Sequence, residues 1–374
     1  MTGAALRVIS PGPLSTVQDL GRSGYQRFGV SVSGAADRYA LRLGNLLTGN
    51  DQRSAAVEVT LGGAEFEFTG NAIFAITGAD LNATLNGSPV PVWETMNSGA
   101  RDRLSLNSPA GPGSGLRAYV NMSGGIDTPQ VLGSRSTHVA ARLGGIDGRA
   151  LEPGDELPIG PVTNPVEVRR RVPDELLPAY GGELVARVVP GPQDDRFDAE
   201  ATALFYGSVY IVSDRSDRMG CRLDGPVIRA IDGAHDIISD GVVTGAIQVP
   251  GDGQPIILLA DRQTTGGYVK IGVIASVDLA LVAQAAPGTA VRFERISAAE
   301  AQSLARARMA ALRDVKIETR EMPIPDTSDP ARRRYRFRIG GRDYEVDIDG
   351  NAQHVPGAAH VNGVEYNVQV NPGG

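Results

Sequence analysis

Several residue types that build common sites are scarce in this chain of 374 residues. A single cysteine, Cys221, excludes an internal disulfide. Four scattered histidines and the lack of any Cys-x2-Cys pair argue against a zinc site, so we predict no metal ligands. Lysine occurs only at Lys270 and Lys316, and arginine supplies nearly all the positive charge.

Long apolar runs and an excess of positive charge are also missing. No stretch approaches the roughly 20 consecutive apolar residues that a membrane helix needs, and the start lacks a charged-then-apolar signal. The formal net charge of -7 leaves no electrostatic footprint for nucleic acid. We expect a cytoplasmic protein that binds neither membrane nor nucleic acid.

Glycine and proline, in contrast, are abundant. The 47 Gly and 24 Pro, with few aromatic residues, predict a mainly β protein of short strands and a few short helices. Within it, "EVTLGGAEFEF" alternates apolar and polar residues around Gly62-Gly63, which predicts a hairpin. Strands are predicted in 55–68, 72–79, 116–125, 182–191, 208–212, 245–251, 254–260 and 290–296, and helices in 34–49, 195–207 and 297–314.

Two stretches follow one plan, which indicates an internal duplication. Residues 115–159 and 254–293 each run through a strand, a Gly-Gly corner, a connector, a Pro-Gly turn and a closing strand. The second corner lies in "DRQTTGGYVKIGVI". We therefore divide the chain into a first β half (1–160), a linker (161–182), a second β half ending in a helix (183–314), and a linker with a small β appendage (315–374).

Polar residues concentrate in three places that are candidates for a site. The first is "GPLSTVQDLGRSGYQRFGVSVSGAADRYA", the second is "SDRSDRMGCRLDGP", and the third spans residues 238–272. Structural salt bridges or a solvated loop remain alternatives for the first two. Buried polar clusters this dense form either a satisfied network or a site. The candidate residues are Gln18, Asp19, Arg22, Ser33, Asp217, Arg218, Arg222, Gln248, Asp252, Gln254, Asp261, Arg262, Gln263, Thr264 and Lys270.

Several familiar chemistries do not fit these residues. A phosphate loop needs Gly-x4-Gly-Lys-Ser/Thr opening a helix, whereas "TTGGYVKIG" has other spacing and runs into a strand-like segment. No Gly-x-Ser-x-Gly elbow occurs. Neither lysine is placed for an amidase triad of two serines and a lysine.

Blocks spread along the chain resemble the biotin-dependent carboxyltransferase family, subdomains A and B, also called KipA-like proteins, allophanate hydrolase subunit 2 or the C subunit of 5-oxoprolinase. The blocks include "GPLSTVQDLGRSGYQRFGVSVSGAAD", "LRAYVNMSGGID", "SDRMGCRLDGP" and "SDGVVTGAIQVPGDGQPIILLADRQTTGGYVKIGVI". The resemblance runs in order from about residue 5 to 300 and implies two related cyclophilin-like β-barrel halves.

The resemblance implies three possible activities. The first is that of the C subunit of an ATP-dependent 5-oxoprolinase, which opens 5-oxoproline to glutamate together with a KipI-like B subunit and a LamB/YcsF-like A subunit. The second is that of the carboxyltransferase component of a biotin-dependent urea or amide carboxylase, for which biotin arrives on a carrier. The third is that of a regulatory protein that binds a KipI-like kinase inhibitor.

Both enzymatic hypotheses need donors over a developing oxyanion and a carboxylate that manages a proton. Under this resemblance, Asp217, Arg218, Asp252, Asp261 and Lys270 are assigned catalytic roles, and the other candidates bind a small amide substrate. The aspartates are alternatively assigned to hold Mg²⁺ with ATP in the complex. The stretch "YRFRIGGRDYEVDIDG" is similar to the opening hairpin of a biotinyl carrier domain, but without the acceptor lysine it cannot carry biotin.

Overall fold

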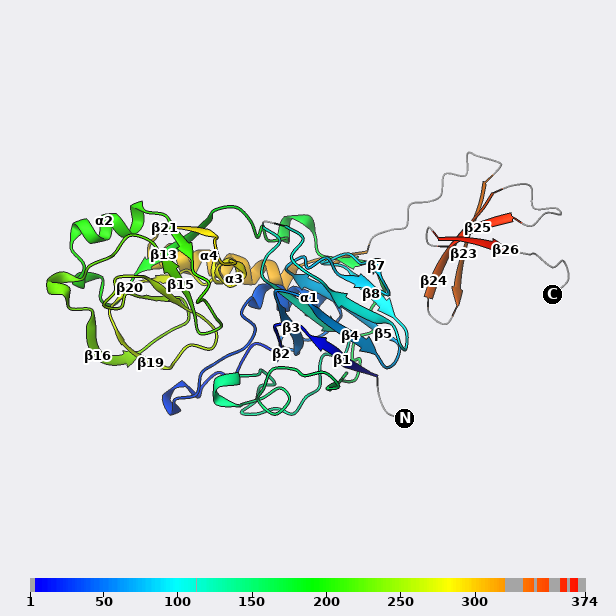
Figure 1. The fold of residues 1–374 in the computed structure, drawn as a ribbon, viewed down its shortest axis with the longest axis horizontal. Coiled ribbons are helices and arrows are strands. Elements are labelled where there is room, and N and C mark those ends of the chain that lie inside the picture. Colours follow the sequence, from blue (N-terminus) through cyan, green and yellow to red (C-terminus); the bar gives the residue numbers. More distant parts are fainter. Residues whose placement is uncertain are drawn as a thin grey trace. The chain divides into compact units, whose positions relative to one another are not determined.

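The computed structural model describes residues 4–111 and 113–319, together with the backbone of four strands between 332 and 368. The chain forms two compact units, Met1–Thr319 and Arg320–Gly374. The first unit holds two β-rich halves that lie side by side (Figure 1). The fold is mainly β, as the composition predicts.

The first half consists of two sheets that enclose one apolar core. The six-stranded sheet has the order β11-β1-β4-β9-β6-β7, and the five-stranded sheet has the order β2-β3-β10-β5-β8. Inward side chains such as Phe66, Phe74 and Val120 are fully buried between them. The strands are β1 (Ala5–Pro11), β2 (Leu14–Gln18), β3 (Ala56–Thr60), β4 (Ala64–Phe68), β5 (Ala72–Gly78), β6 (Thr84–Leu85), β7 (Ser88–Pro89), β8 (Thr95–Ser98), β9 (Arg103–Leu106), β10 (Arg117–Met122) and β11 (Glu156–Pro158).

The hairpin predicted around Gly62-Gly63 is wrong. Strand β3 pairs with β2 and β10, whereas β4 pairs with β1 and β9 in the other sheet. Leu61, Gly62 and Gly63 all have positive φ, and a Cβ at Gly62 would lie 2.2 Å from the carbonyl oxygen of Asn107. The glycines therefore turn the chain from one sheet into the other.

The second half closes into a seven-stranded barrel in the order β13-β20-β17-β18-β15-β14-β21. Phe205 and Phe293 stack in its core with ring centroids 4.5 Å apart. A separate two-stranded ribbon, β16–β19, lies beside it in Figure 1. The strands are β13 (Leu184–Pro190), β14 (Tyr210–Val212), β15 (Gly220–Asp224), β16 (Asp236–Gly241), β17 (Ala246–Gln248), β18 (Ile256–Leu258), β19 (Thr265–Tyr268), β20 (Lys270–Ile274) and β21 (Ala290–Arg295).

The two halves are thus related less closely than the predicted plan suggests. Gly124 and Gly125 do form a corner, with positive φ at both. Gly266 and Gly267, in contrast, lie inside strand β19. The closing strands also differ, because β11 runs antiparallel to β1 whereas β21 runs parallel to β13. The second Gly-Gly corner is therefore a wrong prediction. Of the two β-rich halves, the first is built of two sheets and the second is a closed barrel.

Three of the four α-helices in the described ranges match predicted helices. Asp37 caps α1 by accepting from the backbone N–H of Tyr39 and Ala40, and Ser297 with Glu300 forms the predicted capping box of α4. Helix α3 lies in the segment predicted as a connector. The helices are α1 (Arg38–Leu47), α2 (Ala199–Gly207), α3 (Leu279–Gln284) and α4 (Ala298–Asp314), with short 3-10 turns η1 (Gln26–Phe28), η2 (Val139–Ala141), η3 (Asp174–Leu176), η4 (Asp194–Arg196) and η5 (Ile231–Gly233).

Helices α1, α3 and α4 hold the two halves together. Leu41 and Leu43 of α1, Ala280 of α3 and Leu312 of α4 share one buried apolar cluster. The predicted linker also contributes, because its strand β12 (Arg170–Arg171) pairs with β22 (Glu318–Thr319). Since these contacts bury apolar surface from both halves, the unit ending at Thr319 is one folded body.

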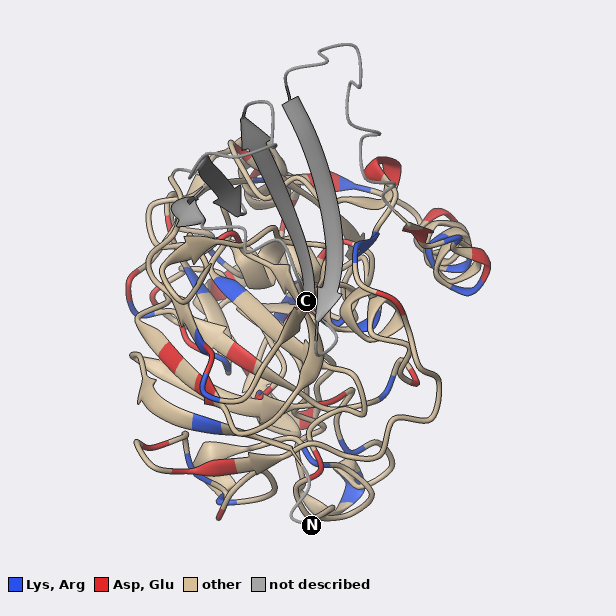
Figure 2. Ribbon diagram, turned by 90° about the vertical axis from the view of Figure 1, so that its right-hand side faces the viewer, with Lys and Arg blue, Asp and Glu red and all other residues tan. Residues whose placement is uncertain are grey.

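The second unit contains a four-stranded antiparallel sheet in the order β23-β24-β25-β26. These strands form the predicted small β appendage and are β23 (Arg332–Ile339), β24 (Arg342–Asp349), β25 (Gly357–Val361) and β26 (Val364–Val368). Within the described part of the chain, no helix is long and apolar enough to cross a membrane. Acidic and basic segments are intermixed over the coloured ribbon in Figure 2.

Candidate functional site

Arg218 lies at the centre of a buried ion-pair network that joins the two halves. Its Nε donates to Asp261 Oδ2 at 2.8 Å, and its Nη2 donates to the carbonyl oxygen of Gly34 at 2.7 Å. Its Nη1 donates to Glu58 Oε1. Burial by itself would lower the pKa of Arg218, but the charges of Glu58 and Asp261 outweigh it, and the pKa is raised. Arg218 is therefore a fully bonded cation.

Two hydroxyl groups extend this network on either side. Ser33 Oγ donates to Asp261 Oδ1 at 2.7 Å, and Tyr119 Oη donates to Glu58 Oε2 at 2.7 Å. Burial, and then the charge of Glu58, raise the pKa of Tyr119 well above its usual value, so its hydroxyl stays protonated. We name Arg218, Asp261, Glu58, Ser33 and Tyr119 the Arg218 cluster.

The first polar stretch of the sequence lies next to this cluster. Gln18 Nε2 donates to the carbonyl oxygen of Thr137 at 3.0 Å, and Ser33 Oγ lies 3.1 Å from the same oxygen. Asp19 Oδ1 accepts from the hydroxyls of Ser134 and Ser136 at 2.6 and 2.5 Å. These contacts fix the loop after β2 against the loop after β10, and the backbone N–H of Ser33 connects the first of these loops to Ala260 of the second half.

Arg22 is fully buried in the same loop but is only partly bonded. Its Nη2 donates to the carbonyl oxygen of Ser136, while its Nη1 has no hydrogen-bond partner among the described residues. Burial lowers the pKa of Arg22, although the charges of Asp19 and Asp261 oppose that effect. One N–H group of a buried cation is thus left for an acceptor.

Arg262, directly after Asp261, is bonded even less completely. Its Nη2 donates to Gln26 Oε1 at 3.1 Å, whereas Nε and Nη1 have no partner in the described ranges. Burial, and then the charge of Arg38, lower the pKa of Arg262. An unpaired buried donor costs about 1–3 kcal/mol, so these groups indicate a site that takes an acceptor.

An amide next to Arg262 shows the same pattern. Gln263 Nε2 donates to Gln248 Oε1 at 3.3 Å, and the buried Gln248 Nε2 is unpaired within the part of the chain that the structure describes. We name Arg262, Gln26, Gln248 and Gln263 the Arg262 cluster. Its free groups are all N–H donors, which suits a carbonyl oxygen or an anion.

Lys270 reaches the neighbouring ribbon. It pairs with Gln248 across strands β17 and β20, and its Nζ donates to Asp240 Oδ1 of β16 at 2.7 Å. Lys270 is only 3% exposed, whereas Asp240 is 43% exposed, so the pair connects the interior with solvent. A Cβ at Gly266 would lie 2.3 Å from Gln248 Nε2, so a larger residue at that point of β19 would displace this amide.

The other predicted site residues are placed elsewhere. Exposed Asp217 and Asp252 accept from nearby backbone N–H groups in turns, and Gln254 bonds the backbone of Gly225. Arg222 is exposed on β15, and Thr264 contributes its carbonyl oxygen to Gln26 and to Val242. Asp217, Asp252 and Asp261 do not come together, so they do not fit a shared Mg²⁺ site. The described residues contain no other group of three metal-ligating side chains.

Sequence reasoning missed the partners that come from distant segments. In the sequence, Glu58 has the position of a polar residue in an alternating strand, and Tyr119 has that of an ordinary residue in an apolar strand. Gln26 donates to the carbonyl oxygen of Val242 at 2.8 Å, although the two residues are more than 200 positions apart in the sequence. Nothing in the spacing of these residues signals their contacts, because each depends on how the two halves meet.

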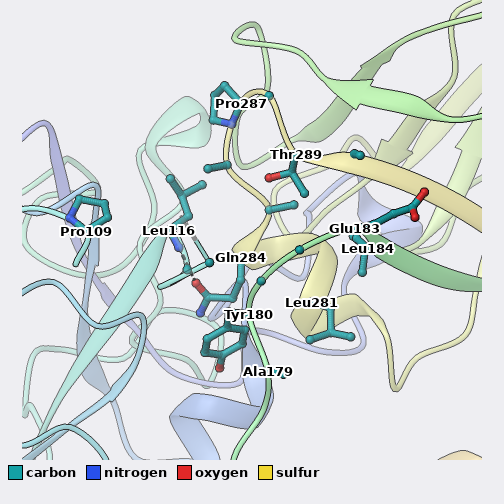
Figure 3. Close-up of a pocket in the computed structure, with 18 of the residues that line it drawn as sticks. Pro109, Leu116, Ala179, Tyr180, Glu183, Leu184, Leu281, Gln284, Pro287 and Thr289 are labelled. Carbon is teal, nitrogen blue, oxygen red and sulfur yellow. Dashed lines mark hydrogen bonds between the residues drawn. The ribbon is translucent and has the colours of Figure 1, made fainter. Parts of the chain in front are cut away.

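A cavity of 480 Å³ lies between the halves, away from the Arg218 and Arg262 clusters (Figure 3). Its central amide is satisfied without any bound molecule. Gln284 Oε1 accepts from the backbone N–H of Leu116 and Arg117, and Nε2 donates to Asp37 Oδ2 and to the carbonyl oxygen of Arg117. None of the predicted site residues lines this cavity, so we place the candidate site at the Arg218 and Arg262 clusters.

Comparisons with known proteins agree on one family. The family model described as "Carboxyltransferase domain, subdomain A and B" matches residues 28–295. The chain is 39% identical over 296 residues to the C subunit of 5-oxoprolinase from Escherichia coli (strain K12), covering 79% of this chain and 93% of that protein.

Longer relatives share the same region. Urea amidolyase of Lachancea kluyveri is 34% identical over 354 residues, which cover 87% of this chain and 19% of that protein. The crystal structure of the K. lactis urea amidolyase superposes with a TM-score of 0.78 at 29% identity, over 94% of this chain and 23% of that one. The chain thus spans about a fifth of the length of these amidolyases.

Proposed function

Since the chain belongs to the family of carboxyltransferase domains, subdomains A and B, we propose that it is the C subunit of a 5-oxoprolinase. The observation that carries this proposal is the match to the E. coli C subunit, which extends over 93% of that protein. The name of that relative implies a complex of several different chains. We infer that this chain acts within such a hydrolase complex.

The proposed chemistry is the opening of a five-membered cyclic amide to glutamate. The amide carbonyl oxygen gains negative charge as the ring opens, so fixed N–H donors around it lower the barrier. The unpaired donors of Arg262 and Gln248 are suited to that task, because they are already buried and hold no other acceptor among the described residues. Removing one such donor typically costs about 10²–10³ in rate.

Other residues are assigned to positioning and to the proton. Asp261 holds Arg218 and Ser33 in place through three hydrogen bonds, so we assign it a positioning role. Lys270 and Asp240 form a pair with one buried and one half-exposed end. This pair is our candidate for passing a proton between the site and solvent.

The proposed reaction needs partner subunits and a cofactor in addition to this chain. We propose a KipI-like B subunit and a LamB/YcsF-like A subunit, with ATP and Mg²⁺ bound at the level of the assembly. The described residues of this chain contain no group of three side chains that could hold Mg²⁺.

Carboxyl transfer to urea or another amide is the second candidate. The similarity to urea amidolyases over 87% of this chain favours it, because those proteins carry the same domain. In that case carrier-borne biotin would deliver the carboxyl group. The donors of the Arg262 cluster would then bind the oxygen of biotin's ureido group or of urea.

An assay of the assembled complex separates the two candidates. We expect ATP hydrolysis and glutamate formation with 5-oxoproline and none with urea. Arg262→Gln should lower turnover at least 100-fold, and Arg229→Gln, which alters an exposed arginine of the same half, should leave it unchanged. Turnover with urea and biotin carrier, but not with 5-oxoproline, would refute the proposal in favour of carboxyl transfer.

A further inference from the structure

A second, smaller cavity lies where helices α1, α3 and α4 meet. It has a volume of 220 Å³ and is bounded on one side by Leu259 and Ala260, directly before Asp261 of the candidate site. Ala260 also accepts from Ser31 and Ser33 through its carbonyl oxygen. The segment from Leu259 to Asp261 therefore borders the cavity with its first two residues and enters the candidate site with its third. The rest of the apolar lining comes from Ala35, Ala36, Val277, Leu279, Ala280, Ala305, Met309 and Leu312.

Three arginines are among the residues that line this cavity, and none of its described lining residues is acidic. Arg38 is exposed to solvent, whereas Arg42 and Arg308 are partly buried. Arg38 and Arg42 come from α1, and Arg308 comes from α4. Arg42 donates to the amide oxygen of Gln52 at 3.0 Å, and Arg308 stacks over the ring of Tyr39 at 4.3 Å. None of the three arginines forms an ion pair with a described carboxylate. Three cations at an apolar cavity are a strong attraction for an anion.

Of the three arginines, Arg38 and Arg42 repel each other. Desolvation by the surrounding protein, and then the charge of Arg42, lower the pKa of Arg38, although the charge of Asp19 opposes them. Burial, and then the charge of Arg53, lower the pKa of Arg42. Both stay protonated near neutral pH, since arginine begins from a very high pKa. A bound carboxylate would relieve this repulsion.

The size and lining of the cavity limit the kind of molecule that can carry the anionic group. Its 220 Å³ is below the roughly 300–1,000 Å³ of sites for drug-sized ligands, which favours a molecule with one small ring. Its lining is mostly alanine, leucine and valine, and its uncharged residues with hydroxyl groups are Tyr39, Thr244 and Ser276. This composition suits a small, mostly apolar body with one charged end.

We propose that this cavity binds the carboxylate of a small organic acid, with Arg38, Arg42 and Arg308 as the anion-binding residues. The choice of 5-oxoproline as the first probe rests on the proposed function, whereas the carboxylate class rests on the three arginines alone. Arg38 also donates to the carbonyl oxygen of Ser33 at 3.3 Å. Arg38, which would hold the carboxylate, therefore contacts a member of the Arg218 cluster directly.

Calorimetric titration of the full chain tests this proposal. We expect 5-oxoproline, glutamate or both to bind, and 2-pyrrolidone, which has the same ring amide as 5-oxoproline without the carboxylate, to bind at least tenfold more weakly. Arg308→Gln should weaken carboxylate binding about tenfold or more, because a charge-assisted hydrogen bond is lost. Arg306→Gln removes the same charge from an exposed position of the same helix and should change nothing.

Several results would overturn the proposal. Equal binding of 5-oxoproline and 2-pyrrolidone, binding of inorganic phosphate but of neither carboxylate, or no binding at all would exclude a carboxylate site. Carboxylate binding that Arg308→Gln leaves unchanged, with both variants equally stable to heat, would place the site elsewhere. Because this titration uses the chain alone, its failure is separate from that of the turnover assay on the complex.

Discussion

Arg218 and Arg262 are both buried in the second half, yet their surroundings differ in every respect. All three nitrogen groups of Arg218 are bonded, and two carboxylates face it. Arg262 has one bonded nitrogen group and faces another arginine instead. The pKa of Arg218 is raised, and that of Arg262 is lowered.

The difference separates architecture from binding. A buried cation that is paired and fully hydrogen-bonded belongs to the fold, and removing it leaves uncompensated charges behind. A buried cation with free donors weakens the fold unless something binds to it. We therefore assign Arg218 to the joint between the halves and Arg262 to the site.

Replacing Arg218 should have the largest effect on stability. Arg218→Met removes the cation that is hydrogen-bonded to both Glu58 and Asp261, and Glu58 keeps only a longer contact of 4.0 Å with Arg117. We expect a loss of about 3–5 kcal/mol in the free energy of unfolding. Denaturant titration of the full chain measures it. Arg215→Met removes an exposed ion pair with Asp224 and should cost less than about 1 kcal/mol. Equal losses for the two variants would mean that the Arg218 cluster does not hold the halves together.

The same substitution at Arg262 should behave differently. Arg262→Met removes unpaired donors and a charge that faces Arg38, so we expect stability within about 1 kcal/mol of the natural chain, or slightly above it. The measurement is the same denaturant titration, in the absence of any substrate. A loss as large as that of Arg218→Met would show that Arg262 is structural and would remove the contrast between them.

Asp37 tests whether hydrogen bonds alone compensate a buried charge. It accepts from Tyr39, Ala40, Tyr180 and Gln284, yet burial raises its pKa above the ordinary value. A carboxyl group with a raised pKa in the folded state stabilises the fold most while protonated, and that contribution is lost as the pH rises through the raised value.

The chain should therefore lose stability relative to Asp37→Asn as the pH rises from about 4 toward neutrality, by an amount on the order of 1 kcal/mol. Denaturant titrations of both proteins across this range give the difference directly. Asp51→Asn, at an exposed aspartate near the end of α1, serves as the control and should give a flat difference. The opposite slope for Asp37→Asn would mean that its four donors outweigh burial.

Local features of the fold were predictable because they depend on neighbouring residues. The capping box of Ser297 and Glu300, the start of α1 after Asp37 and most strands follow from short-range patterns. The turn at Gly62-Gly63 was predictable as a turn but not as a hairpin, since the sheet that each strand joins depends on distant partners. Helix α3 was missed because a helix of six residues gives little periodicity.

By itself, the sequence determined the family resemblance, the mainly β class and which segments carry polar residues near a site. Only the tertiary structure decided which of those residues meet. It joined Asp261 to Ser33 and Arg218 to Glu58, and it left Asp217 and Asp252 in exposed turns. In "DRQTTGGYVKIGVI" the glycines lie in a strand, and only the fold showed that the charge of Asp261 is paired whereas donors of Arg262 are free. The physical reason is that burial and pairing arise from contacts between segments far apart in the chain, which no local pattern encodes.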